Sequence, residues 1–67
     1  MDVTKKIAKY IDDNGIKLSV LANRTSIPAQ ALYDSLGKNG TRKLKADELL
    51  RICDVLKLNP MDFRPAN

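Results

Sequence analysis

The amino-acid sequence predicts an all-α fold, a compact bundle of five short helices. Apolar side chains recur at spacings of three and four along the chain, which is the period of one face of a helix. Proline, glycine and asparagine interrupt these runs and divide them into short segments. With 67 residues, of which 43% are hydrophobic and 30% charged, the sequence fits one globular domain, residues 1–67, with a frayed tail from about residue 64.

The first helix is indicated by apolar residues at positions i, i+4, i+7 and i+8. These residues are Val3, Ile7, Tyr10 and Ile11. Asp2 is expected to cap the start of this helix, and Asn14-Gly15 to end it, because glycine readily adopts the left-handed conformation that follows a helix. The lysines on its polar side are interpreted as a solvated face, with phosphate contact as the alternative, and they are Lys5, Lys6 and Lys9.

Residues 18–36, LSVLANRTSIPAQALYDSL, indicate two short helices joined by a tight corner. Each helix has its own apolar set, Leu18, Leu21 and Ala22 on the first and Leu32 and Leu36 on the second. The polar residues 23–26 favour local turn hydrogen bonds over continued helix. Pro28 is expected in the first turn of the second helix, and Ile27, which precedes it, at the corner. Two helices and a short turn within about 19 residues are typical of a helix-turn-helix.

Positive charge is concentrated between residues 38 and 45. The formal net charge is +4, and this segment holds no acid and four cations, Lys38, Arg42, Lys43 and Lys45. Such a cluster is the expected footprint of a surface that binds phosphate, and a basic loop that only keeps the protein soluble is the alternative. Gly37, Asn39 and Gly40 are expected to provide positive φ angles that let the backbone approach a ligand closely.

A fourth helix is predicted from about Ala46, with a core stripe at positions i, i+3, i+4 and i+7. The stripe consists of Leu49, Ile52, Cys53 and Leu56. Asp47 and Glu48 in the first turn and Lys57 in the last turn suit the helix dipole. Cys53 is expected to be a buried apolar filler rather than a reactive thiol.

Asn59-Pro60 predicts the start of a fifth short helix that ends at Phe63. Asparagine is a favourable N-cap, and proline is a favourable first helical residue. Met61 and Phe63 are either the last residues of the core or part of a dimer contact. Leu44, between the basic segment and the fourth helix, is expected to anchor that segment on the core.

The composition excludes several functional classes. There is no histidine and only one cysteine, so neither an internal disulfide nor a structural zinc site nor any other cofactor is expected. The chain offers no set of nucleophile, base and metal ligands and no glycine-rich phosphate loop, so it is not expected to be an enzyme. No apolar run approaches the ~18 residues that span a bilayer, and the N-terminus has no apolar secretory segment. A cytoplasmic protein without a membrane partner or small-molecule substrate is therefore expected.

Residues 18–36 resemble the helix-turn-helix of the lambda-repressor and Cro type, the xenobiotic-response-element family of DNA-binding regulators. The matched features are Leu21-Ala22 on the first helix, Ser26 at the turn, Ile27 after it and Leu32 in the second helix. The segment LLRICDVLKLNPMDF is similar to the closing helix, turn and last short helix of the family. The resemblance runs from about Val3 to Phe63 and implies a lambda-repressor-like domain of a bacterial or phage protein associated with the nucleoid.

The resemblance places residues 28–36 in the major groove of double-stranded DNA. The residues that it implies as base contacts are Ala29, Gln30, Tyr33 and Asp34. Gln30 is the strongest candidate, because its amide can pair bidentately with adenine N6 and N7. Core packing is the alternative for Tyr33, and a surface acid without a DNA contact is the alternative for Asp34.

Phosphate contacts are expected on both sides of this helix. The residues are Lys17, Ser19, Lys38, Asn39, Thr41, Arg42 and Lys43. Members of the family commonly carry a phosphate-binding glutamine at the position of Leu18, and leucine cannot donate a hydrogen bond. Lys17, Ser19 or the free amides of the helix start are therefore expected to supply that contact, and a plain surface role is the alternative for Ser19.

The resemblance implies a transcriptional regulator that acts by occupying its DNA site, most simply as a repressor. A monomer in solution, or a weak homodimer that pairs on DNA, is expected, because no separate oligomerisation segment is present. The alternative is a protein-interaction module of the same fold, such as an antitoxin or a phage-type accessory factor, with weak or nonspecific DNA binding.

Overall fold

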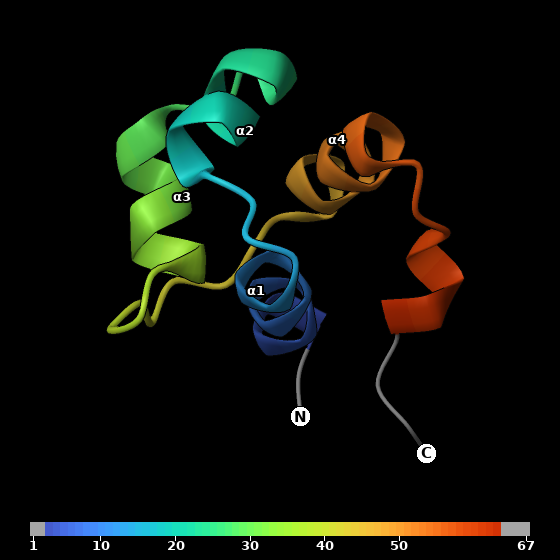
Figure 1. Ribbon diagram of the computed structural model, residues 1–67, viewed down its shortest axis with the longest axis horizontal. Helices are drawn as coiled ribbons and strands as arrows, with labels where there is room; N and C mark the ends of the chain where they lie inside the picture. The colour runs from blue at the N-terminus through green and yellow to red at the C-terminus, as the bar shows by residue number, and fades with distance from the viewer. Residues whose placement is uncertain (1–2, 64–67) are drawn as a thin grey trace.

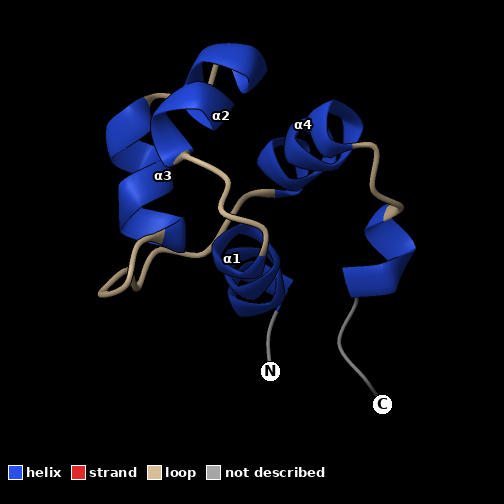
Figure 2. Cartoon of the chain, viewed as in Figure 1, coloured by secondary structure: helices blue, strands red, loops and turns tan. Residues whose placement is uncertain are grey.

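Four α-helices and one short 3₁₀ helix make up the computed structural model, which describes residues 3–63 (Figure 2). The elements are α1 (Val3–Asp13), α2 (Leu18–Thr25), α3 (Ala29–Leu36), α4 (Ala46–Leu56) and η1 (Pro60–Phe63). Residues 3–63 contain no strand, so the predicted all-α class is confirmed. The count of five helices was slightly off, because η1 is a single 3₁₀ turn. The proposed cap at Asp2 and the tail from residue 64 lie outside the described residues.

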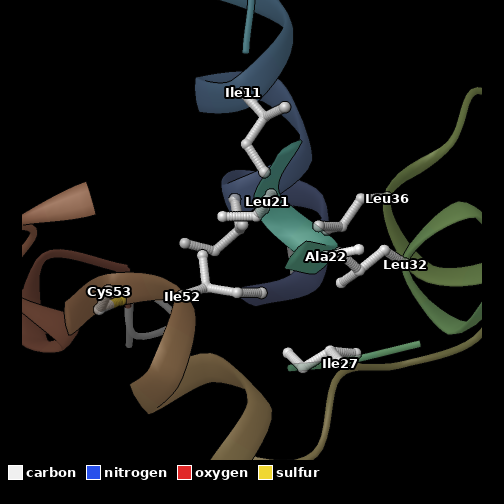
Figure 3. Packing of buried hydrophobic residues seen from close by; sticks show 9 residues of the cluster. Ile11, Leu21, Ala22, Ile27, Leu32, Leu36, Ile52 and Cys53 are labelled. Atoms are coloured by element: carbon white, nitrogen blue, oxygen red, sulfur yellow. The ribbon is translucent and has the colours of Figure 1, made fainter. Parts of the chain in front are cut away.

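The helices meet in a core built from aliphatic side chains of every α-helix. Its buried members are Ile7, Ile11, Leu21, Ala22, Ile27, Leu32, Leu36, Ile52 and Cys53 (Figure 3). α2 packs against both α3 and α4, while α1 packs against α3 and η1 (Figure 1). The apolar spacings therefore predicted the inward faces, since every one of these residues except Ile27 lies on a helix. Ile27 reaches the core from the corner between α2 and α3.

Ile27 lies in the corner between α2 and α3, as predicted, but α2 ends later and α3 begins one residue later than the sequence predicted. α2 continues through Thr25, because the Thr25 hydroxyl donates to the carbonyl of Leu21 (2.8 Å) and is satisfied within the helix. The left-handed turn falls on Ser26, with φ 61°. Pro28 has ψ 136° and precedes α3 as its N-cap. The prediction that it lies in the first turn of the helix is therefore wrong. The carbonyl of Pro28 still accepts the amide of Leu32 (3.2 Å), which opens the new helix.

α1 and α4 end in the same way, with one residue in the left-handed conformation. Gly15, with φ 63°, follows α1 in the left-handed conformation, as the sequence predicted, and the amide of Ile16 donates back into that helix. After α4 this position is occupied by Lys57, with φ 59°, and the amide of Leu58 donates to the carbonyl of Cys53 (2.8 Å). Lys57 therefore caps α4 and does not belong to its last turn, where it was predicted.

Candidate nucleic-acid interface

The outer face of α3 carries all four residues that were predicted to contact bases. They are Ala29, Gln30, Tyr33 and Asp34, and each is exposed. Leu32, Ser35 and Leu36 are buried on the opposite face, as a helical period requires. Tyr33 is 49% exposed, so the alternative that it packs in the core is wrong. α3 thus presents a mixed polar and aromatic surface outward.

Two of these side chains are joined to one another on the helix surface. The Nε2 of Gln30 donates to Oδ1 of Asp34 at 3.0 Å, a pair separated by one helical turn. The amide of Gln30 has a second N–H and a carbonyl oxygen besides. A donor and an acceptor side by side are the two groups that bidentate pairing with adenine requires.

The segment after α3, which we call the basic loop (residues 37–45), folds back on the end of that helix. The amide of Gly37 donates to the carbonyl of Tyr33 (3.0 Å), and the amide of Arg42 donates to the carbonyl of Asp34 (3.0 Å). At the tip, the amide of Gly40 donates to the carbonyl of Gly37 (3.0 Å). Backbone hydrogen bonds therefore define the conformation of the loop, which projects from the C-terminal end of α3 (Figure 1).

Gly37 and Gly40 serve this loop differently from the prediction. Neither has a positive φ angle, since Gly15 is the glycine with that conformation among residues 3–63, and the prediction of a positive φ is wrong for Asn39 as well. A Cβ atom at Gly37 would lie 2.5 Å from the carbonyl oxygen of Tyr33, and one at Gly40 would lie 2.5 Å from that of Asp34. Glycine is therefore needed because the loop backbone passes so close to the end of α3.

The loop and α3 together line a shallow hollow on the surface. Its lining includes Tyr33, Asp34, Lys38, Asn39, Thr41 and Arg42. The structure thus brings together two base-contact and four phosphate-contact candidates that lie up to nine positions apart in the sequence. Lys38, Asn39, Thr41 and Lys43 are exposed, whereas Arg42 is only partly exposed.

Arg42 is held by the protein through both terminal nitrogens of its guanidinium group. Its Nη1 donates to Oε1 of Glu48 (3.0 Å) and to the hydroxyl of Ser35 (2.9 Å), and its Nη2 donates to Oε2 of Glu48 (2.9 Å). The side chains of Arg42 and Glu48 are 30% and 10% exposed. The hydrogen bond from Arg42 is the main cause that holds the pKa of Glu48 below its usual value, and the amide of Lys45 contributes, against the opposing effect of burial.

Sequence reasoning missed the residues that hold the loop at its base. Glu48 was interpreted only as an acid favourable to the helix dipole, and Ser35 and Thr4 were not considered. The hydroxyl of Thr4 accepts the amide of Leu44 (2.9 Å), which ties the end of the loop to α1 and confirms Leu44 as an anchor. A glutamate at the third position of a helix, three residues after the N-cap, was the available indication for Glu48.

Other predicted phosphate contacts and cations lie near the basic loop. Lys17 and Ser19 are exposed at the start of α2, and a groove lined by Leu18 and Lys38 brings that first turn beside the basic loop. Lys5 of α1 lines a second hollow with Thr41, Arg42 and Lys43, so it extends the basic surface beyond the predicted set. Lys9 instead bonds Asp13 at 2.8 Å on the exposed side of α1, as expected of a solvated face.

Residues 3–63 offer no evidence of a metal site, a membrane-spanning helix or a reactive thiol. No cluster of three or more histidine, cysteine or acidic side chains is placed to hold a metal there, and every helix is too short or too polar to span a bilayer. Cys53 is buried in the core, and burial raises the pKa of its thiol, as expected of an apolar filler.

A tight corner between α2 and α3, an outward polar face on α3 and a cationic loop beside it define a helix-turn-helix protein of the DNA-binding class. Residues 6–63 match the family model described as the Cro/C1-type HTH DNA-binding domain. The chain belongs to this family, and the resemblance to lambda-repressor and Cro proteins is confirmed. No curated protein and no solved structure matches the chain.

Proposed function

We propose that this chain is a sequence-specific transcriptional regulator that binds double-stranded DNA and acts as a repressor. The observation that carries the proposal is the continuity of two surfaces, because the exposed face of α3 and the basic loop line one hollow. A helix that enters the major groove is held there by groups beside it that contact the phosphate backbone, and cations serve this purpose. Membership in the Cro/C1-type family supports the same surface.

α3 is the reading helix in this proposal. Gln30 pairs with adenine through its free N–H and carbonyl oxygen, and Ala29 at the helix start contacts a thymine methyl group. Tyr33 packs on sugar or methyl groups with its hydroxyl toward a phosphate. Asp34 orients the amide of Gln30 through their hydrogen bond and can accept from cytosine N4.

Phosphates are held on the two flanks of α3. The basic loop supplies Lys38, Asn39, Thr41 and Lys43, and the start of α2 supplies Lys17 and Ser19 with its free amides. These contacts fix the register of the protein on the duplex and are independent of sequence. The single domain acts as a monomer in solution that pairs weakly on DNA, in the cytoplasm, and it represses by occupying its site without catalysis.

The protein-interaction alternative has one observation in its favour. Three large apolar side chains that line none of the hollows beside the basic loop are about half exposed, namely Val20, Leu50 and Met61. Exposed apolar side chains can mark a surface for another protein. A module of that kind would bind DNA weakly or without sequence preference.

Selection of duplexes from a random pool, at two salt concentrations, tests the proposal. The purified chain is expected to enrich one motif, and Gln30→Ala is expected to lose affinity mainly for that motif, by about 1–3 kcal/mol. Lys43→Gln is the matched control, because it should weaken binding to all sequences alike and reduce the salt dependence. Salt-sensitive binding without an enriched motif would contradict sequence-specific regulation and favour the interaction module.

A further inference from the structure

The cation that is most embedded in the basic loop is Arg42, at the point where the loop leaves α3. We propose that Arg42 is a positioning residue, which holds the loop in the shape that meets a phosphate backbone and does not itself bind phosphate. This inference rests on the proposed function, since it assigns a role within the same DNA-binding surface. It separates Arg42, which shapes the loop, from Lys38 and Lys43, which contact the ligand.

The guanidinium group is already engaged within the protein. Its hydrogen bonds to Glu48 and Ser35 use three of the five N–H donors of an arginine. The pair with Glu48 is bidentate, the geometry in which an arginine also grips a phosphate. A phosphate oxygen would have to displace the carboxylate to take the same place, and would then leave Glu48, which is only 8% exposed, as an unpaired buried charge.

Arg42 joins three parts of the fold that are separate in the sequence. Its backbone amide donates to the carbonyl of Asp34 in α3, and its side chain binds Ser35 of α3 and Glu48 of α4. Glu48 also accepts the amide of Lys45 at 2.9 Å, which fixes the far end of the loop. The same carboxylate thus holds the loop on both sides of residues 43–44. The tip, residues 38–41, lies between Gly37 and Arg42, whose backbone amides both bond α3.

The neighbouring loop cations are placed differently. Lys38 and Lys43 are exposed, while the side chain of Arg42 is 30% exposed. Lys38 lines the hollow beside Tyr33, and Lys43 lines the hollow beside Lys5. A phosphate can therefore meet either lysine without breaking a contact of the Glu48 carboxylate.

The two possible roles of Arg42 predict opposite results for Glu48→Gln. If Arg42 binds phosphate, removing its carboxylate partner frees the guanidinium and should tighten DNA binding. If Arg42 positions the loop, Glu48→Gln loosens the loop and should weaken binding, although the variant is one unit more positive. Asp47→Asn is the matched control, because it removes one negative charge from the adjacent, exposed position. Within residues 3–63 the ion pair of Asp47 is with Arg51, at 3.4 Å.

The first measurement is the affinity of the full chain and its variants for a duplex from the random pool, at one fixed salt concentration. We expect Glu48→Gln to weaken binding at least fivefold and Asp47→Asn to leave it unchanged or tighten it up to twofold. Arg42→Lys keeps the charge but cannot form the bidentate pair, so it too should weaken binding at least fivefold. Tighter binding by Glu48→Gln, or wild-type affinity of Arg42→Lys, would overturn the inference. Far-ultraviolet circular dichroism checks that each variant is folded.

The second measurement requires no DNA and separates the inference from the proposed function. In Glu48→Gln, hydrogen exchange of the backbone amides of Gly40 and Arg42 should speed up at least tenfold. The first amide bonds the carbonyl of Gly37 within the loop, and the second ties the loop to the carbonyl of Asp34 in α3. The exchange rate of the Leu58 amide, which bonds the carbonyl of Cys53 at the C-terminal end of α4, should change less than twofold. Unchanged exchange at Gly40 and Arg42 would refute the positioning role. Failure of the wild-type chain to bind any duplex would instead refute the proposed function.

Discussion

Lys57 occupies a backbone position that glycine fills elsewhere in this molecule. Gly15 and Lys57 both follow an α-helix with φ angles near 60°, at 63° and 59°. A side chain in this conformation places Cβ too close to the following carbonyl and costs about 1–2 kcal/mol, which glycine avoids. The same pattern of hydrogen bonds thus ends both helices, with an unstrained glycine after α1 and a strained lysine after α4.

We therefore expect Lys57→Gly to raise the free energy of unfolding by about 0.5–1 kcal/mol. Gly15→Ala, the matched change at the equivalent position of α1, should lower it by about 1 kcal/mol. Urea denaturation followed by circular dichroism measures both. A loss of stability in Lys57→Gly would show that the lysine side chain supplies a contact worth more than the backbone strain.

At the scale of elements, the best predicted parts are those whose residues obey a helical period. The apolar stripes of α1 and α4 and the outward face of α3 followed from spacing alone. α2 runs further than predicted because the hydroxyl of Thr25 can bond within a helix as well as in a turn. The basic loop was predicted as a charge cluster, but its architecture depends on contacts across seven and six positions, from Arg42 to Ser35 and Glu48, that no local period reveals.

The contact between the basic loop and α4 should make stability depend on pH. The pKa of Glu48 in the folded chain lies below its ordinary value of 4.5, chiefly because of the hydrogen bond from Arg42. The unfolded chain therefore binds the proton more readily, so the stabilisation is fully present above pH 4.5 and is lost as the pH falls from there through the folded-state pKa.

Urea denaturation of the wild-type chain and of Glu48→Gln between pH 7 and pH 3 tests this dependence. The variant is expected to be less stable than the wild type by about 2 kcal/mol at neutral pH, since it loses a charge-assisted pair. The difference should narrow as the solution becomes acidic. A difference that stays constant over the whole range would contradict the assigned role of this carboxylate.

At the scale of the whole molecule, the small hydrophobic core sets the orientation of α3, whose outer face is exposed. Leu32 is fully buried on the inner face of α3, one position before the exposed Tyr33. The core therefore sets which residues of α3 face outward, because a rotation of the helix would expose Leu32. What the sequence could not supply at this scale is the approach of α1 to the loop, since Lys5 and Thr4 lie far along the chain from residues 41–44.

Leu32→Ala is expected to cost about 2–5 kcal/mol of stability through lost burial and a residual cavity. A core of this size supplies roughly 3–5 kcal/mol in total, so the variant should be largely unfolded at room temperature. Leu50→Ala, at a leucine that is 56% exposed on α4, is the control and should change stability by less than about 0.5 kcal/mol. Equal thermal melting curves for the two variants would contradict this account of the core.

Titration of the ¹⁵N-labelled chain with a short DNA duplex, followed through backbone amide shifts, tests the central claim most directly. The account predicts that the largest shift changes fall on α3 at Gln30 and Tyr33, on loop residues 38–41 and on the first turn of α2. The amides around Leu50 on α4 and Met61 on η1 should stay in place. Shift changes confined to α4 and η1, with α3 and the basic loop unaffected, would contradict it.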